Sequence, residues 1–168
     1  MIKNLFEGKQ VGILYHLLNF DQMKFMIENN KLKSQNFFNG ISFTRDKTLN
    51  NYIGSRPIVV FKIEVDGNKL SNKYKIEPFQ YISSTNVIFS EFEEIVRTTE
   101  IKDIFKYINK IIFIANNIER DIKYMSNWIR KTNINILLNK IKFKIPFYVQ
   151  VNNKFVKDYN YLKEKGFI

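Results

Sequence analysis

Short apolar stretches separated by polar connections run along the chain, and their spacing predicts both strands and helices. Residues 11–15 (VGILY) form a β-prone apolar run that predicts a buried strand, with His16 at its end. Asn19 then stands at an N-cap position with Gln22 three residues later, which predicts a short helix ending at residues 29–30. A strand and a helix therefore follow one another directly.

The middle of the chain has the pattern of strands. Residues 41–44 alternate apolar and hydroxyl side chains, which predicts a half-buried strand. Residues 58–65 are the strongest β-prone run and are closed by the Asp66-Gly67 turn signal. Residues 70–79 contain a proline, so an edge strand or a loop is expected there rather than a central strand.

The second half mixes the two periodicities. Residues 87–96 fit either a bent strand or the start of a helix, whereas residues 101–108 have apolar side chains at helical spacing. Residues 110–115 predict a strand, and residues 146–149 a terminal strand. Residues 119–132 predict an amphipathic helix whose inward side chains are Ile122, Met125, Trp128 and Ile129.

These elements indicate an α+β fold. Strands and helices intermingle without a repeating β-α-β period, which argues against a doubly wound sheet. The six glycines form neither a GxGxxG fingerprint nor a Walker loop, which argues against an ordinary Rossmann or P-loop nucleotide site. With 168 residues and no repeat or linker, residues 1–168 are expected to form a single domain.

Composition excludes several kinds of chemistry. The absence of cysteine rules out disulfides, thiol nucleophiles and cysteine-bound zinc, and a single histidine rules out a histidine-rich metal site, so no metal is expected. No apolar run approaches the roughly 20 residues of a membrane helix. The N-terminus has no long apolar segment of the secretory kind, so we expect a soluble cytoplasmic protein that does not contact membranes.

The net charge of +11 is unevenly distributed. Basic and acidic residues number 12 and 7 in residues 1–84, 1 and 4 in residues 85–100, and 14 and 5 in residues 101–168. Solvated lysines explain this pattern, and so does a surface that binds nucleic acid. The candidate nucleic-acid contacts are Lys140, Lys142 and Lys144, and Tyr124, Trp128, Phe143, Phe147 and Tyr148 are either a stacking surface or core residues.

Three short blocks carry candidate chemistry, and each also has a purely structural explanation. His16 is either a packed side chain or a donor to a ribose hydroxyl. On a strand, Ser42 and Thr44 would share one face while Arg45 offers a fork of donors to a diphosphate. Alternatively, Thr44 or Asp46 caps the turn that follows.

The third block is the acidic SEFEE segment of residues 90–94. Ser90 and Glu93 have the spacing of a capping box, which would begin a helix. On a strand, Glu91 and Glu93 would instead point to the same side, as paired-carboxylate chemistry requires. The pattern alone leaves both interpretations open.

In this order, the blocks resemble the core of the ADP-ribosyltransferases, especially the small bacterial and phage-type members. The matching segments are Tyr15-His16, Ser42-Phe43-Thr44-Arg45-Asp46 and Glu91-Phe92-Glu93-Glu94, within residues 11–115. The resemblance implies a mixed or antiparallel β core of two small sheets with flanking helices. It also implies transfer of ADP-ribose from NAD to a nucleic-acid or protein acceptor, as in toxins and phage–host interference factors, with an antitoxin as a further partner.

The resemblance assigns roles to individual residues. His16 would bind the ribose or the nicotinamide amide, and Ser42 and Thr44 match the S-x-T pattern of the second block. Glu93 would stabilise the oxocarbenium-like transition state, Glu91 would orient the acceptor, and Glu94 competes with Glu93 for the catalytic position. The rest of the NAD pocket would come from Tyr15, Phe43, Arg45 and Tyr52.

Two other functions compete with this one. An RNA phosphotransferase on a related fold needs further basic or histidine residues in its motifs, and the chain has one histidine. A protein of a different class would bind nucleic acid or nucleotides without catalysis, through the basic C-terminal half.

Overall fold

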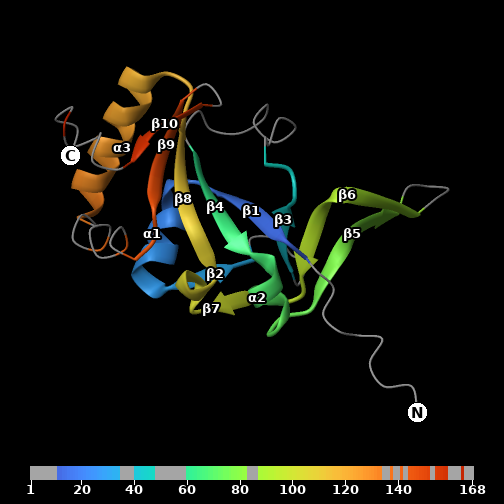
Figure 1. The fold of residues 1–168 in the computed structure, drawn as a ribbon. Coiled ribbons are helices and arrows are strands. Elements are labelled where there is room, and N and C mark those ends of the chain that lie inside the picture. The colour runs from blue at the N-terminus through green and yellow to red at the C-terminus, as the bar shows by residue number, and fades with distance from the viewer. Residues whose placement is uncertain are drawn as a thin grey trace, which may run out of the picture.

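The computed structural model describes residues 11–34, 40–47, 60–82, 87–133, 137, 141, 144–151, 154–158 and 164. The fold is α+β and consists of a large, mostly antiparallel sheet, a two-stranded ribbon and a few helices (Figure 1). The α+β class predicted from the sequence is therefore confirmed.

The large sheet has eight strands in the order β10-β9-β8-β4-β1-β3-β6-β5, and among the described strands only β8 and β9 pair in parallel. Its strands are β1 (Ile13–Leu18), β3 (Ile41–Thr44), β4 (Val60–Asp66), β5 (Ile76–Ile82), β6 (Val87–Val96), β8 (Ile108–Ala115), β9 (Phe147–Val151) and β10 (Lys154–Asp158). The ribbon pairs β2 (Lys31–Lys33) with β7 (Glu100–Lys102). The helices are α1 (Phe20–Asn29), α2 (Gly67–Ser71), α3 (Ile118–Thr132) and the 3₁₀ turn η2 (Ile104–Lys106).

The expectation of two small sheets is corrected, because β1 joins two groups of strands into one sheet. On one side β1 pairs with β4 over its whole length, from Ile13 opposite Asp66 to Leu18 opposite Phe61. On the other side it pairs with β3, where Tyr15 lies opposite Thr44. This long-range pairing makes the sheet continuous, and no local sequence pattern indicates it.

Helix α1 forms as its sequence predicts. The Gln22 amide donates to the Asn19 side chain at 2.9 Å, and the Asn19 amide donates to Gln22 Oε1 at 2.6 Å, which completes the capping box. At the other end, Asn30 adopts a left-handed conformation (φ 52°) and its amide donates to the Met26 carbonyl at 2.9 Å. The strand before the helix continues to Leu18, however, so His16 lies within β1 rather than at its end.

Helix α3 also confirms its prediction. Ile122, Met125 and Ile129 are buried and Trp128 is partly buried against the core. The core contains a group of packed rings, with Phe61 centroids 5.5 Å from Phe20 and Trp128 and 5.4 Å from Phe113. Both α1 and α3 therefore pack on the same face of the large sheet (Figure 1).

The helix predicted over residues 101–108 is wrong. Ile101 pairs with Leu32 in the ribbon, Asp103 turns the chain in a left-handed conformation (φ 53°), and Ile108 begins β8. Ile101, Ile104 and Ile108 are all buried. Their helical spacing thus arises from a strand, a single 3₁₀ turn and a second strand that all face the same core.

The remaining predicted strands are present, whereas the predicted turn at Asp66-Gly67 has a different role. Residues 87–96 are a strand, β5 is the edge strand that its proline indicated, and the predicted strand at residues 146–149 is β9, which β10 follows. The Asp66-Gly67 signal does not close a hairpin. Instead, the Asp66 side chain accepts from the Lys69 amide at 2.9 Å and caps α2.

The alternation of side chains divides the large sheet into two faces. On the core face, the side chains packed with α1 and α3 include Leu14, Leu18, Phe43, Phe61, Ile63 and Phe113. The opposite side is called the polar face here. Its polar residues, placed by strand register, include Tyr15, Ser42, Thr44, Lys62, Glu64, Glu93, Lys110 and Gln150.

Candidate active site

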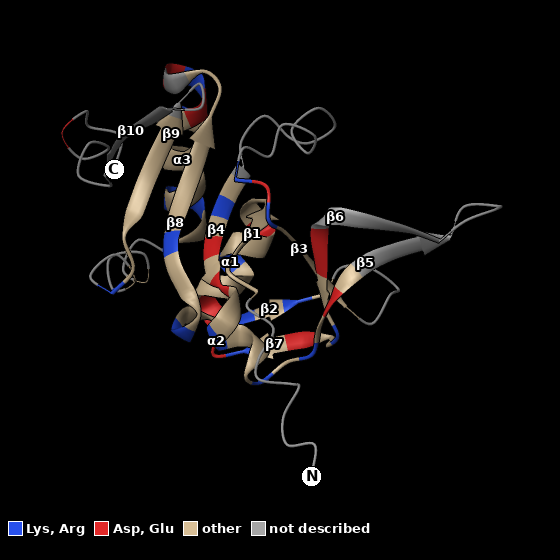
Figure 2. Ribbon diagram, turned by 45° about the vertical axis from the view of Figure 1, so that its right-hand side comes forward, with Lys and Arg blue, Asp and Glu red and all other residues tan. Residues whose placement is uncertain are grey.

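The large sheet brings the three blocks onto neighbouring strands. His16 is on β1, Ser42 and Thr44 are on β3, and the glutamates are on β6, and these strands lie side by side in that order. Figure 2 shows the acidic segment of β6 in red, next to β3. Residues separated by some 80 positions in the chain are therefore close in the fold.

Ser42 links the histidine to a glutamate. The His16 Nδ1 lies 2.6 Å from the Ser42 carbonyl oxygen, and because a carbonyl can only accept, Nδ1 carries the proton and donates it. The Ser42 hydroxyl donates to Glu93 Oε1 at 3.4 Å. A continuous series of polar contacts thus runs from β1 through β3 to β6.

Two opposing influences act on the Glu93 carboxyl. Burial raises the pKa of the Glu93 carboxyl above its usual value of 4.5, and the hydrogen bond from Ser42 opposes this by lowering it. Glu93 lies opposite Thr44 in the register of β3 and β6, so both side chains are on the polar face. Its carboxyl is therefore bonded to the Ser42 hydroxyl and is on the same face as Thr44.

The candidate residues divide between the two faces of the sheet. The His16 ring lies 5.2 Å from the Phe43 ring, and Glu94 lies opposite Phe43 in the register. These three residues are on the core face, whereas Tyr15, Ser42, Thr44 and Glu93 are on the polar face. The contact between the two groups is made by the Ser42 backbone, which accepts the bond from His16.

Arg45, expected at a diphosphate, is bonded to Glu94. Arg45 Nη2 lies 2.5 Å from Glu94 Oε1, and the Glu94 side chain is only 5% exposed. The Thr44 hydroxyl accepts from the Asp46 amide at 3.0 Å, so the structural interpretation of Thr44 as a turn cap is confirmed. A ligand on the core face would meet a guanidinium whose direction is already fixed by this ion pair.

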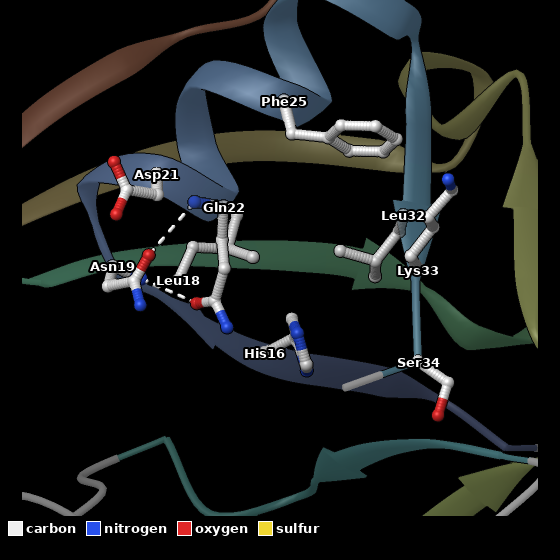
Figure 3. A pocket seen from close by; sticks show the side chains of 9 residues that line it. All are labelled: His16, Leu18, Asn19, Asp21, Gln22, Phe25, Leu32, Lys33 and Ser34. Carbon is white, nitrogen blue, oxygen red and sulfur yellow. Dashed lines mark hydrogen bonds between the residues drawn. The ribbon is translucent and has the colours of Figure 1, made fainter. Parts of the chain in front are cut away.

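A cavity of about 420 Å³ opens beside His16 on the core face (Figure 3). It lies between β1, α1 and β2, and its lining residues are His16, Leu18, Asn19, Asp21, Gln22, Phe25, Leu32, Lys33 and Ser34. Its polar groups include the Asp21 carboxylate and Lys33, whose Nζ lies 4.8 Å from the centre of the Phe25 ring. The volume is within the range typical of small-molecule sites.

Sequence reasoning identified only His16 among these lining residues. Asn19 and Gln22 were recognised as helix caps, but a capping pattern gives no indication of a cavity. The available signal was the short connection from the histidine-bearing strand to the helix, because it confines residues 16–22 to a small volume. Ser34, which donates to the Gly40 carbonyl at 2.7 Å, comes from a separate segment.

A second polar group on the polar face was not predicted. Lys62 is 2% exposed, and its Nζ donates to the Lys47 carbonyl at 3.0 Å and to Gln150 Oε1 at 3.4 Å. Burial lowers the pKa of Lys62, and the positive charges of Lys47 and Lys110 lower it further. Lys110 Nζ in turn lies 2.8 Å from the buried Glu64 carboxylate.

Tyr15 belongs to the same group. The Lys62 Nζ lies 5.4 Å from the centre of its ring, and burial, followed by the charge of Glu64, raises the pKa of its hydroxyl. In the sequence, Lys62 and Glu64 alternate with apolar residues, which is typical of a solvent-exposed strand face. Their burial could not be seen from this one strand.

Some predicted residues lie outside the described part of the chain. Tyr52, Lys140 and Lys142 are outside the described residues, and Glu91 lies on β6 with a side chain that is likewise outside them. Lys144 is exposed in the turn before β9. Among the described residues, no group of three or more acidic or histidine side chains is arranged to hold a metal ion.

None of the helices in the described ranges has the length and apolar character needed to cross a membrane. Comparisons with protein-family models, with curated proteins and with solved structures gave no match.

Proposed function

We propose that this protein is an NAD-dependent mono-ADP-ribosyltransferase with an ADP-ribosyltransferase-like fold, acting on a nucleic-acid or protein acceptor. The observation that supports this most is the series of contacts from His16 through Ser42 to Glu93 across three neighbouring strands. The resemblance in sequence assigns ribose binding, pocket formation and catalysis to these same residues. Their connection in space gives that assignment a physical basis.

In the proposed reaction, the bond between nicotinamide and the ribose anomeric carbon breaks, and nicotinamide leaves as a neutral base. Positive charge develops on the ribose in the transition state, and an ionised Glu93 stabilises it. The acceptor nucleophile then bonds to the anomeric carbon and releases its proton to a carboxylate or to water. Glu91 is proposed to orient that acceptor.

In the version of the site that uses Glu94, NAD would occupy the cavity beside His16, because both residues are on the core face. The cavity beside His16 is lined by Phe25 and Lys33, which offer an aromatic ring and a cation. These are the groups that a dinucleotide with a base and a diphosphate needs. Among the remaining pocket candidates, Arg45 forms an ion pair with Glu94. Glu94 is on the core face of the sheet, as is His16.

The division of the glutamates between two faces gives two versions of this site. Glu93 bonds to the Ser42 hydroxyl on the polar face, whereas Glu94 shares the core face with His16 and the Arg45 guanidinium. The proposal favours Glu93, because its carboxyl has a hydroxyl donor and Glu94 is already held by an arginine. The alternative is that Glu94 is catalytic and Glu93 positions β3.

The test is release of nicotinamide from labelled NAD, with and without cell lysate. We expect Glu93→Gln to reduce turnover at least about 100-fold, since a transition-state contact of this kind is worth that much. Glu119→Gln on the exposed surface of α3 is the matched control and should leave turnover unchanged. Loss of turnover with Glu94→Gln but not with Glu93→Gln would assign catalysis to Glu94.

Label transferred to a macromolecule would identify the acceptor class by its sensitivity to nuclease or protease. No binding and no turnover of NAD by the folded wild-type protein would contradict the proposal. The non-catalytic nucleic-acid-binding function would then remain, and it depends on the basic C-terminal half rather than on Glu93.

A further inference from the structure

Helix α3 presents a basic stripe to the outside of the molecule. Its exposed side chains recur at positions i, i+3, i+4, i+7, i+10 and i+11, which places them on one side of the helix. They are Arg120, Lys123, Tyr124, Asn127, Arg130 and Lys131. The opposite side of α3 is buried against the sheet, so this stripe is the outer surface of the layer, where Figure 2 shows blue segments of α3 behind β8 and β9.

Three of these cations are available to an outside partner. Arg120 Nε bonds to the buried Asp121 carboxylate at 2.9 Å, so its charge is largely offset. The Arg130 guanidinium donates to the neutral Asn127 side chain at 3.1 Å, which orients it without neutralising it. Lys123 and Lys131 are both exposed, and neither takes part in an ion pair with another described residue.

Tyr124 adds an aromatic surface in the middle of the stripe. Its side chain is 57% exposed, more than any other large hydrophobic residue in the described part of the chain. Exposed aromatic rings beside cations are characteristic of surfaces that bind single-stranded nucleic acid, where bases stack on rings and phosphates meet the cations. An acidic peptide would use the cations but would gain little from the ring.

We infer that the outer face of α3 binds single-stranded nucleic acid, with Lys123, Arg130 and Lys131 contacting phosphates and Tyr124 stacking on a base. The stripe spans 12 residues from Arg120 to Lys131, about 16 Å over 11 steps at 1.5 Å per step. A strand whose bases are stacked as in a duplex advances about 3.4 Å per phosphate, so this length would face about five phosphates and is long enough for three contacts. The net charge of +11 adds long-range attraction for the same partner.

This surface also bears on the acceptor of the proposed transferase. The idea that the bound nucleic acid is also the acceptor rests on the proposed function. Binding itself requires neither NAD nor Glu93, so a protein without transferase activity could still bind nucleic acid, and the reverse. Binding is measured without NAD, and turnover is measured with Glu93→Gln as its own control.

The experiment is fluorescence anisotropy with a labelled single-stranded oligonucleotide of mixed sequence, titrated with the full chain at several salt concentrations. Three phosphate contacts predict a slope of about −2 in log K against log[salt], so affinity should fall about 15-fold between 50 and 200 mM salt. The triple variant Lys123→Gln, Arg130→Gln, Lys131→Gln should lose most of this slope. Tyr124→Ala should weaken binding about tenfold, and Tyr124→Phe should not.

The matched control changes the same number of charges elsewhere. Lys73, Lys102 and Lys106 are exposed and lie on or beside α2, β7 and η2, and their triple glutamine variant should bind like the wild type. Equal binding by the two triple variants would overturn the inference. Tighter binding of polyglutamate than of the oligonucleotide at equal salt would overturn it as well, because the surface would then recognise acidic protein.

Discussion

Phe61 and Lys62 are consecutive residues of β4 and are equally buried, at 1% and 2% exposure, yet they face opposite sides of the sheet. Phe61 lies among the rings of Phe20, Phe113 and Trp128, under α1 and α3. Lys62 lies among polar groups, with its ammonium bonded to a carbonyl and an amide. The same depth of burial therefore serves two different purposes.

The difference lies in what each face gains from excluding water. On the core face, burial of apolar rings contributes directly to the free energy of unfolding. On the polar face, burial has a cost, because charged and hydroxyl groups lose their hydration and require partners. Such a face is retained where positioned polar groups are useful, and the polar face is the one that includes Ser42 and Glu93.

The largest effect is expected on the core face, from Phe61→Ala. Phe61 is 1% exposed and touches several rings, so its removal should lower the free energy of unfolding by about 3–5 kcal/mol. Urea denaturation followed by tryptophan fluorescence measures this directly, because Trp128 packs against Phe61. As a control, Tyr124→Ala removes an exposed ring and should change stability by less than about 0.5 kcal/mol.

A smaller effect on stability is expected from Lys62→Met, the neighbouring substitution on the polar face. It removes two hydrogen bonds but also a buried charge, so the net change near neutral pH should stay within about 1 kcal/mol. A loss as large as that of Phe61→Ala would show that both faces stabilise the fold in the same way.

The pH dependence of stability also distinguishes Lys62→Met from the wild type. Burial lowers the pKa of Lys62 in the folded protein below its usual 10.5. At pH values between this lowered pKa and 10.5, the unfolded chain therefore binds more protons than the folded protein. Wild-type stability should therefore rise with pH in this window, and Lys62→Met should lack this rise. Lys73→Met, at an exposed lysine, should retain it.

The elements that the sequence predicted well are those with local causes. The capping box of Asn19 and Gln22 fixes the start of α1, and the apolar stripe of α3 fixes which side is buried. The helix predicted over residues 101–108 was wrong because a strand, a turn and a second strand can place apolar residues at helical spacing. Only the pairing of Ile101 with Leu32 in the ribbon separates the two cases.

The candidate site could be predicted only in part, for the same reason. The residue types of the three blocks were visible, but their faces depend on register, which the pairing of Tyr15 with Thr44 sets across 29 positions of the chain. The cavity depends on β2 and α1 lying over His16. The buried group around Lys62 requires β4, β8 and β9 together, so no single segment could reveal it.

The smallest effect on stability is expected from Glu93→Gln. The sign of this effect shows whether burial or hydrogen bonding dominates at this position of the polar face. Burial raises the pKa of Glu93 in the folded protein above its usual 4.5. At pH values between 4.5 and this raised pKa, the folded protein therefore binds more protons than the unfolded chain. Wild-type stability should fall as the pH rises through this window, and Glu93→Gln should remove that fall. The variant should thus be at least as stable as the wild type near neutral pH.

Urea denaturation of both proteins near neutral pH and at about pH 4, where an ordinary glutamate is mostly protonated, measures this difference. Ser42→Ala is the companion variant, because it removes the hydrogen bond that lowers the pKa of Glu93 and should steepen the fall with pH. If Glu93→Gln were less stable than the wild type near neutral pH but not in acid, the folded protein would stabilise the charged carboxylate, and bonding rather than burial would dominate at this position. A stable but inactive Glu93→Gln, by contrast, would separate the cost of burying this carboxyl from its use in catalysis.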